Sequence, residues 1–395
     1  MPTPAPRLAI VVSHPVQYYS PWFRWLAAHA GLPLRVFYLW DAGVRPARDP
    51  QFGKTFAWDV DLLSGYEHEF VPNTARRPGT DHFGGLRNPA LPARLAAWQP
   101  DAVLLFGYNY ATHLRLVLRA GLRGVPLIFR GDSHLLGRAR PSPLKRLLLG
   151  LLYRRFAAFA CVGSANRDYF RAFGVPERKL FPVPHCVDAS RFAATDDARA
   201  EAARLRAALG LTDERVILFA GKLVPAKQPR ALLEAFLALA PARAALVFVG
   251  EGAECPALES LAAAHPGTPV RFLPFANQSA MPARYLLADL FALPSAGLYE
   301  TWGLAVNEAM HLGVPCLVSD RVGCQRDLVT DGETGWVFPA TDPDGLRRAL
   351  GRALDDLATD APAFRRRVAA RIAGHTYAAA TDGLLRAVRS LFPSA

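Results

Sequence analysis

The sequence predicts an α/β protein of two Rossmann-like, doubly wound parallel-sheet domains that face each other across a cleft. Short apolar runs alternate with helical patterns, which is typical of βαβ units and a parallel sheet. The runs are apolar throughout, as expected of strands that are covered on both faces. The alternation stops once near the middle of the 395 residues and then restarts, and a single core rarely extends over such a length.

Four apolar runs in the first half are expected to be strands, and helical patterns follow two of them. Residues 184–214 then form a turn-rich connection and a polar helix, where we place the interdomain boundary. Five further apolar runs are each followed by a helical segment or a loop. The expected strands are 8–13, 34–39, 101–106 and 126–129 in the first series, and 216–220, 245–249, 270–273, 290–294 and 315–319 in the second.

Three units follow from this pattern. We expect an N-terminal domain over 1–190, a second domain over 197–375, and a last helix over 376–395 that packs back on the first domain. The last segment is amphipathic, which fits such a crossing. Because open α/β sheets bind ligands outside the carboxyl ends of their strands, we expect the functional site in the cleft between the domains.

Composition narrows the class of protein. The five cysteines form no CxxC pair, and their odd number fits no complete disulfide framework, which favours a reducing compartment. The amino terminus has only a very short apolar run, so we expect neither a signal peptide nor a membrane span there. These features predict a cytoplasmic location. A net charge of +12 favours polyanions, which include nucleic acid, the anionic inner membrane face and phosphorylated small molecules.

One stretch combines a leucine run of helical length with the basic residues Lys145, Arg146, Arg154 and Arg155. An interfacial membrane helix has this composition. So does an ordinary packing helix of an α/β domain, because the leucines leave no wide polar face. Peripheral contact with the anionic inner membrane therefore stays open. Nucleic acid is not an expected partner, because the positive charge is dispersed and no recognition module is present.

Two carboxylates stand out in residues 294–319. Glu300 follows a strand and a loop, and Trp302 to Leu304 are expected to open a helix that contains Glu308. At ~100° per residue, both carboxylates can point into one cleft. The start of that helix offers free backbone N–H groups and the positive end of a dipole, which suit a phosphate. Taken singly, each glutamate could equally be a solvated charge.

This segment resembles the Glu-x7-Glu motif of the retaining glycosyltransferases of family four, which have the GT-B fold. The resemblance continues on both sides of the motif and covers essentially all of residues 214–350. In that family the first glutamate contacts hydroxyls of the donor sugar and the second contacts the ribose, which implies these roles for Glu300 and Glu308. The resemblance also implies retention of the anomeric configuration by front-face attack assisted by the leaving phosphate, without a covalent nucleophile.

A basic turn follows the expected strand 216–220. Gly221, Lys222 and Lys227 resemble the family segment that holds two basic residues, although the first of these is more often arginine in the family. Two ammonium groups can neutralise a diphosphate without a metal. We therefore expect no metal and no cofactor, with a nucleotide-diphosphate sugar as the co-substrate.

Further donor contacts are expected at two strand ends. Gly250 follows strand 245–249 in a turn that lacks the third glycine of a dinucleotide fingerprint, so we do not expect NAD binding. Phe275 lies in a segment that resembles the stretch whose backbone contacts the nucleotide base in members of the family. The expected donor-binding residues are Gly221, Lys222, Lys227, Gly250, Phe275, Glu300, Thr301, Trp302, Gly303, Leu304 and Glu308.

Two loops of the N-terminal half are expected to face the acceptor. The first carries a His-Pro-x-Gln-Tyr element that resembles a subgroup of the family, and its residues could be acceptor contacts or structural plugs. In the second, Asp132 could accept a hydrogen bond from the attacking hydroxyl or cap a helix. His185, near the domain junction, is expected to be structural. The acceptor-side candidates are His14, Gln17, Tyr18, Arg130 and His134.

The sequence thus predicts a transferase that passes a sugar from a nucleotide-diphosphate sugar to a saccharide, lipid-linked or small-molecule acceptor in glycan or polysaccharide biosynthesis. Its expected catalytic residues are Glu300, Lys227, Lys222 and Asp132. A sugar-nucleotide epimerase of the same fold is one alternative. A catalytically inactive glycan-binding or scaffold relative is the other.

Overall fold

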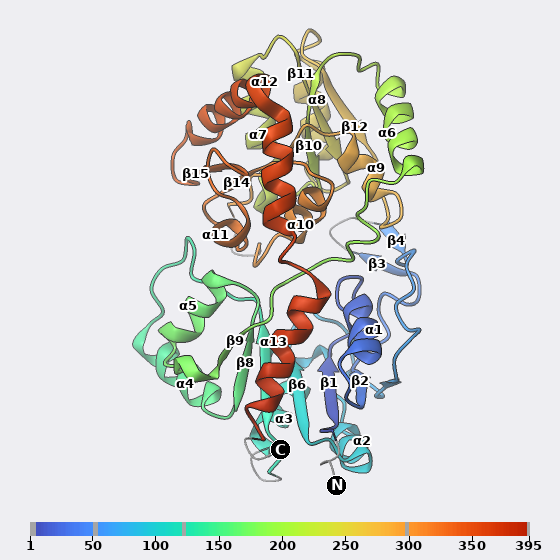
Figure 1. Cartoon of the computed structure of the whole chain (residues 1–395), viewed down its shortest axis with the longest axis vertical. Helices are drawn as coiled ribbons and strands as arrows, with labels where there is room; N and C mark the ends of the chain where they lie inside the picture. Colours follow the sequence, from blue (N-terminus) through green and yellow to red (C-terminus); the bar gives the residue numbers. More distant parts are fainter. Residues whose placement is uncertain (1–4, 50–53, 121–123, 297–299, 393–395) are drawn as a thin grey trace.

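The computed structural model describes residues 5–49, 54–120, 124–296 and 300–392 of the chain. Two parallel sheets lie one above the other along the longest axis of the molecule, and helices flank each of them (Figure 1).

The N-terminal sheet has seven strands, and all of its pairings are parallel. They are β1 (Leu8–Val12), β2 (Leu34–Tyr38), β5 (His68–Phe70), β6 (Ala102–Phe106), β7 (Leu127–Gly131), β8 (Ala158–Cys161) and β9 (Leu180–Pro182). The order β5-β2-β1-β6-β7-β8-β9 reverses direction between β1 and β6, which makes the sheet doubly wound. The helices of this half are α1 (Ser20–His29), η1 (Phe83–Gly85), α2 (Leu91–Trp98), α3 (Ala111–Ala120), α4 (Pro143–Tyr153), α5 (Ser164–Ala172) and η2 (Glu177–Lys179).

The C-terminal sheet repeats this topology with six parallel strands. They are β10 (Arg215–Ala220), β11 (Ala244–Val249), β12 (Val270–Leu273), β13 (Leu290–Leu293), β14 (Cys316–Ser319) and β15 (Gly335–Phe338). The order β12-β11-β10-β13-β14-β15 reverses between β10 and β13. The helices of this half are η3 (Pro225–Lys227), α7 (Pro229–Leu239), α8 (Cys255–Ala263), α9 (Met281–Leu286), α10 (Leu304–His311), α11 (Gln325–Leu328) and α12 (Gly345–Ile372).

Every strand expected from an apolar run is present, because these strands are covered on both faces. All six residues of β11, for example, are buried. The runs did not predict β5, β8, β9 or β15, which are only three or four residues long. The leucine-rich stretch covers residues 141–159. It forms α4 only as far as Tyr153, and its last residue, Phe159, lies in β8.

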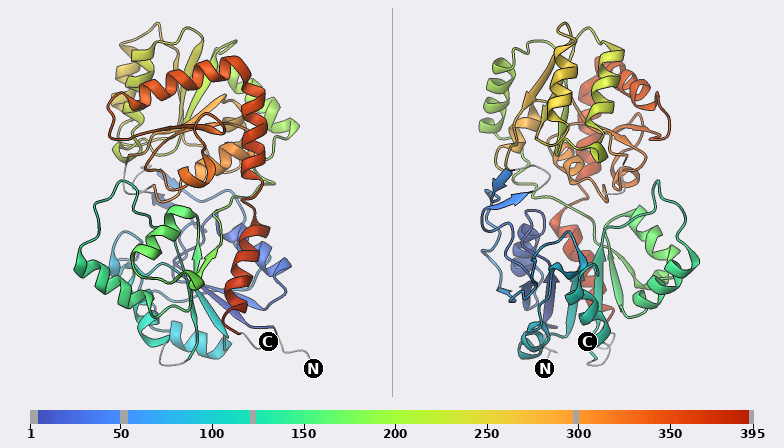
Figure 2. Two further views of the ribbon diagram at one scale, coloured as in Figure 1. Left: turned by 60° about the vertical axis from the view of Figure 1, so that its left-hand side comes forward. Right: turned by 180° about the vertical axis from the view of Figure 1, so that it is seen from behind.

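The chain crosses between the halves twice, once before α6 (Asp196–Ala208) and once between α12 and α13 (Tyr377–Arg389), as Figures 1 and 2 show. Helix α13 packs against α1, β8 and β9 of the N-terminal half. Its buried face includes Leu384 and Val388, and Thr381 accepts a hydrogen bond from the indole of Trp22 at 3.3 Å. The last helix of the chain therefore completes the core of the first half.

A small antiparallel hairpin of β3 (Ala47–Asp49) and β4 (Lys54–Phe56) also joins the halves. The ring of Phe56 lies 4.7 Å from the ring of Phe275, which follows β12. This hairpin carries no apolar run, and nothing in the sequence pattern indicated it. Among the helices in the described part of the chain, none is both long and apolar enough to cross a membrane.

The close contact of α13 with β9 generates a stability prediction. A Cβ atom at Gly383 would overlap the Pro182 carbonyl and lie 3.2 Å from Val183 Cγ2. We expect Gly383→Ala to lower the free energy of unfolding by about 1–3 kcal/mol, the usual cost of overpacking. Gly374→Ala is the matched control, because a Cβ there meets nothing within 4 Å. Equal thermal denaturation midpoints for both variants would contradict the prediction.

Candidate active site

A cavity of about 500 Å³ lies between the two halves, where the strands of both sheets end. Its walls include residues that follow β1 and β7 in the N-terminal half and β10, β11, β12 and β13 in the C-terminal half. The pairs β1–β6 and β10–β13 are also the points at which the strand order reverses, the usual ligand position in doubly wound sheets.

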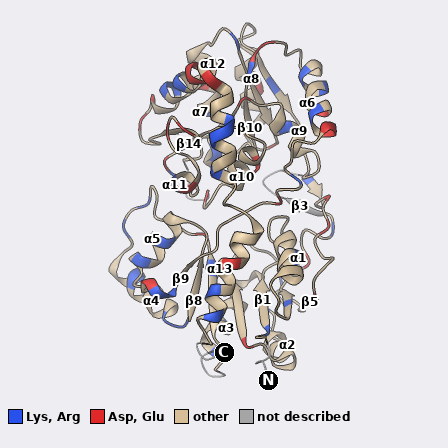
Figure 3. Ribbon diagram, viewed as in Figure 1, with Lys and Arg blue, Asp and Glu red and all other residues tan. Residues whose placement is uncertain are grey.

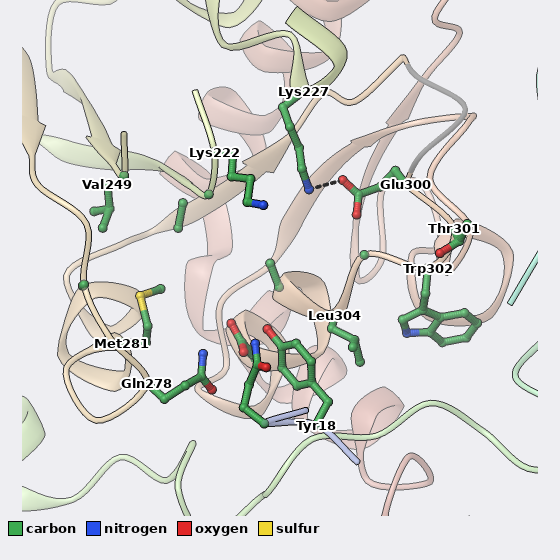
Figure 4. A pocket seen from close by; sticks show the side chains of 18 of the residues that line it. Tyr18, Lys222, Lys227, Val249, Gln278, Met281, Glu300, Thr301, Trp302 and Leu304 are labelled. Carbon is green, nitrogen blue, oxygen red and sulfur yellow. Dashed lines mark hydrogen bonds and ion pairs between the residues drawn. The ribbon is translucent and has the colours of Figure 1, made fainter. Parts of the chain in front are cut away.

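An ion pair between Lys227 and Glu300 forms part of the C-terminal wall (Figure 4). Lys227 ends the short helix η3 and donates to Oε2 of Glu300, which follows β13. The hydroxyl of Ser295 donates to the same oxygen at 2.9 Å. The fold thus places a cation and a carboxylate that are distant in sequence in one cavity wall.

Lys222 points into the same cavity from the end of β10 (Figure 4). Gly221 follows β10, and Gly250 follows the neighbouring strand β11. The two glycines approach closely, since a Cβ atom at Gly250 would overlap the carbonyl of Gly221. Both glycines have positive φ, 146° at Gly221 and 139° at Gly250. A side chain is therefore excluded at Gly250, and the backbone borders the cavity beside the lysine.

The first turn of α10 faces the cavity through Gly303, Leu304 and Ala305. Its N–H groups lack intrahelical partners, and the positive end of the helix dipole lies here, so the turn favours an anion. The helix begins at Leu304 with Gly303 as its N-cap, within the segment Trp302 to Leu304 that was expected to open it. Gly303 has a φ of +96°, a left-handed conformation that keeps the residues before it out of the helix.

Glu308 is buried inside α10 with 3% of its surface exposed. Tyr285 donates to Oε2 at 2.6 Å, and Tyr18 approaches the same carboxyl group from the other half of the molecule. Burial raises the pKa of Glu308 to about 7. Glu308 is one of the residues that line the cavity, and its other oxygen, Oε1, is buried without a hydrogen-bond partner within the described residues. This oxygen therefore has unused capacity to accept a hydrogen bond.

Trp302 borders the cavity but serves mainly in packing. Only 3% of its surface is exposed, and its indole N–H donates to Oδ1 of Asn307 at 2.8 Å. Its ring lies 5.5 Å from that of His185, which in turn stacks on Tyr19 at 6.0 Å. His185, which was expected to be structural, therefore also lines the cavity.

Two residues after β7 hold the loop that carries Glu300. Thr301 donates to Oδ2 of Asp132 at 2.7 Å, and this hydrogen bond joins the two halves. Asp132 also lines the cavity. Helix α4, the next along the chain, is capped by Ser142 instead. The Nδ1 of His134 accepts from the backbone, and its Nε2 therefore donates to the Glu300 carbonyl at 3.2 Å. His134 lies outside the cavity lining and positions Glu300.

Two expected acceptor contacts lie away from the cavity. Arg130 is 3% exposed, donates to the Val183 carbonyl at 2.9 Å, and places its guanidinium 4.9 Å from the Trp22 ring centre. His14 packs against Trp40 with ring centres 6.1 Å apart, and burial lowers its pKa to about 4. Both side chains are held by the N-terminal core, which is the physical reason for correcting these expectations.

Gln17, Tyr18 and the other expected donor residues do border the cavity. Sequence reasoning missed several further wall residues. Tyr19 directly follows the His-Pro-x-Gln-Tyr element, so its position in the sequence could have indicated that it lines the cavity. Trp58 and Tyr285 offered none, since the first follows an unpredicted hairpin and the second lies in a short helix. The missed residues include Tyr19, Trp58, Val224, Ala226, Met281 and Tyr285.

No cluster of three or more His, Cys, Asp or Glu side chains in the described ranges is arranged to hold a metal ion. All five cysteines are free, and four of them are buried.

Two family models match the chain. Residues 202–369 match the model described as Glycosyl transferases group 1, and residues 24–191 match Glycosyltransferase Family 4. The D-inositol 3-phosphate glycosyltransferase of Frankia alni is 34% identical over 83% of this chain and 87% of its own. The GDP-mannose-dependent alpha-(1-6)-phosphatidylinositol monomannoside mannosyltransferase of Mycolicibacterium smegmatis is 33% identical over 61% of this chain. That match spans 63% of the relative, which is less than two thirds of its length.

Two solved structures share the fold over nearly the whole chain. Sucrose-phosphate synthase from Thermosynechococcus elongatus has a TM-score of 0.73 and 21% identity, and it covers 99% of this chain and 100% of its own. The Anabaena protein HepE, in complex with UDP and glucose, has a TM-score of 0.71 and 16% identity, covering 98% and 100%. At these identities the likeness shows the fold alone, and it confirms the expected GT-B architecture.

The buried carboxyl of Glu308 generates a pH prediction. Burial raises its pKa from 4.5 to about 7, so between these values the native state binds more protons than the unfolded state. The free energy of unfolding must then fall as pH rises through this window. Glu308→Gln removes this titration. As pH rises from 4.5 to about 7, the free energy of unfolding of the variant should increase relative to that of the wild type by on the order of 3 kcal/mol.

Urea denaturation at several pH values measures this difference. Glu259→Gln, at an exposed carboxylate on α8, is the control and should leave the pH dependence of the wild type unchanged. If Glu308→Gln and the wild type kept a constant difference over the window, Glu308 would not be the titrating group.

Proposed function

The chain belongs to the group 1 glycosyl transferases of family 4, and on that premise we propose that it transfers a sugar from a nucleotide-diphosphate-sugar donor with retention of configuration. The acceptor is a saccharide, a lipid-linked molecule or a small molecule in glycan or polysaccharide biosynthesis. The observation that carries this proposal is the pair Lys227 and Glu300 in one cavity wall, beside Lys222 and the start of α10. The relative that is named as GDP-mannose-dependent supports a nucleotide-sugar donor.

The groups that line the cavity suit such a donor. In the proposed complex Phe275 and Gly250 contact the nucleoside, and Glu308 offers its Oε1 to the ribose. Lys222 and the first turn of α10 face the diphosphate. Glu300 accepts hydrogen bonds from the sugar hydroxyls at the other end.

The chemistry of the proposed step is electrostatic. The bond from the anomeric carbon to the diphosphate oxygen breaks, and the acceptor oxygen bonds that carbon on the same face while its proton passes to the leaving phosphate. Charge that develops on the diphosphate is stabilised by Lys222, Lys227 and the dipole of α10. Asp132 borders the cavity from the opposite half, where it can orient the acceptor hydroxyl. No covalent nucleophile is required.

We also propose a cytoplasmic location with peripheral contact at the anionic inner membrane face. The free cysteines favour a reducing compartment, and the net charge of +12 favours an anionic surface.

Loss of either member of the ion pair should slow transfer. We expect Lys227→Ala and Glu300→Gln each to lower kcat/KM by roughly 10- to 150-fold, equivalent to about 1.5–3 kcal/mol for a charge-assisted hydrogen bond. Steady-state kinetics with the identified donor and acceptor measure this. Arg366→Ala and Glu333→Gln, at exposed positions outside the cavity lining, are the matched controls. Wild-type turnover in both site variants would refute the assignment.

Transfer should not need a divalent metal. Two ammonium groups and a helix terminus supply the positive charge that a metal provides in other enzymes. We expect kcat to change less than about twofold when EDTA is added in excess. A large loss that added Mg²⁺ or Mn²⁺ restores would contradict the metal-independent mechanism.

A donor panel tests the class of reaction itself. The protein is incubated with UDP-, GDP- and ADP-sugars, with and without candidate acceptors, and the released nucleoside diphosphate and the sugar products are measured. A transferase releases diphosphate only when an acceptor is present. Conversion of the sugar without an acceptor would identify an epimerase, and no turnover with any pair would favour a scaffold.

A further inference from the structure

Helix α4 exposes a stripe of leucines that the cavity chemistry does not use. Leu144, Leu147, Leu148 and Leu151 are 65%, 59%, 58% and 48% exposed. Their spacing of three, four and seven positions puts them on one face of the helix. The opposite face is packed, since Tyr153 is 2% exposed in the N-terminal core. The stripe is therefore a surface and not a part of the core.

Exposed cations flank this stripe. Lys145, Arg146, Arg154 and Arg155 are all exposed. Figure 3 shows Lys and Arg on α4. Residues 133–167 contain no Asp or Glu at all, so nothing within this stretch neutralises the cations. The helix thus combines an apolar face with a cluster of exposed positive charge, the two properties of an interfacial membrane helix.

We propose that the leucine stripe of α4 and its four flanking cations dock on an anionic lipid bilayer. The leucines enter the boundary between headgroups and acyl chains, and the cations meet lipid phosphates. This inference assigns the membrane contact of the proposed function to one surface, but it does not depend on glycosyl transfer.

Charge complementarity favours a bilayer over a second copy of the chain. In a symmetric dimer the same patch faces itself, which would bring the cations of both copies together. Like charges across an interface oppose association. Anionic headgroups instead neutralise them.

The position of α4 connects this surface to the cavity. One segment, residues 132–142, runs from Asp132 in the cavity wall to the start of α4. This segment therefore connects the docked helix directly to the acceptor side of the cavity. Among the proposed acceptors, docking favours the lipid-linked class.

Vesicle cosedimentation of the full chain tests the proposal without donor or acceptor. We expect binding to vesicles of phosphatidylcholine and phosphatidylglycerol in about equal amounts, little binding to phosphatidylcholine alone, and release as salt rises. Leu144→Gln with Leu148→Gln should weaken binding about tenfold or more. Arg154→Gln with Arg155→Gln should weaken it about 25-fold at low salt, roughly fivefold for each cation.

The matched control is Leu118→Gln with Arg115→Gln on α3, where both side chains are exposed. It should bind within about twofold of the wild type, as surface changes elsewhere do. Equal weakening by this control, or wild-type binding by both α4 variants, would overturn the proposal. So would a dimer in light scattering that the leucine variant alone abolishes, because the stripe would then belong to a second copy. Failure of vesicle binding would leave the donor panel result unaffected.

Discussion

The ion pair between Lys227 and Glu300 is the contact on which the chemistry of this molecule depends. The fold brings the ends of β10 and β13 together, and a cation and a carboxylate from those ends meet in one wall. The pair is only partly buried, and the hydroxyl of Ser295 also donates to the Glu300 carboxylate. A donor that offers both hydroxyls and a diphosphate can bond each member without leaving either charge unsatisfied.

The N-terminal half contributes position more than chemistry. His134 holds the carbonyl of Glu300, and Asp132 holds the hydroxyl of Thr301. Tyr18 reaches the carboxyl of Glu308 from the same side. The site is therefore complete only when the two halves are together. Closure would exclude water from a reaction in which hydrolysis of the donor competes.

Much of the fold could be predicted from the sequence because strands covered on both faces are apolar throughout. A common cavity for Glu300 and Lys227 could be predicted because two separate segments, the Glu-x7-Glu motif and the basic turn, each resemble a donor-contacting segment of the family. Their ion pair was not predicted. Arg130 and His14 could not be placed, since burial of a guanidinium or an imidazole depends on aromatic neighbours from distant segments. The positioning role of His134 depends on a backbone carbonyl, which leaves no trace in the sequence.

Calorimetric titration of Glu300→Gln tests the central claim most directly. If Glu300 contacts the sugar hydroxyls, the variant should bind the nucleotide sugar about tenfold more weakly than the wild type does, while its affinity for the nucleoside diphosphate alone stays unchanged. Equal affinities of variant and wild type for the nucleotide sugar would contradict the account, because Glu300 would then lie away from the bound donor.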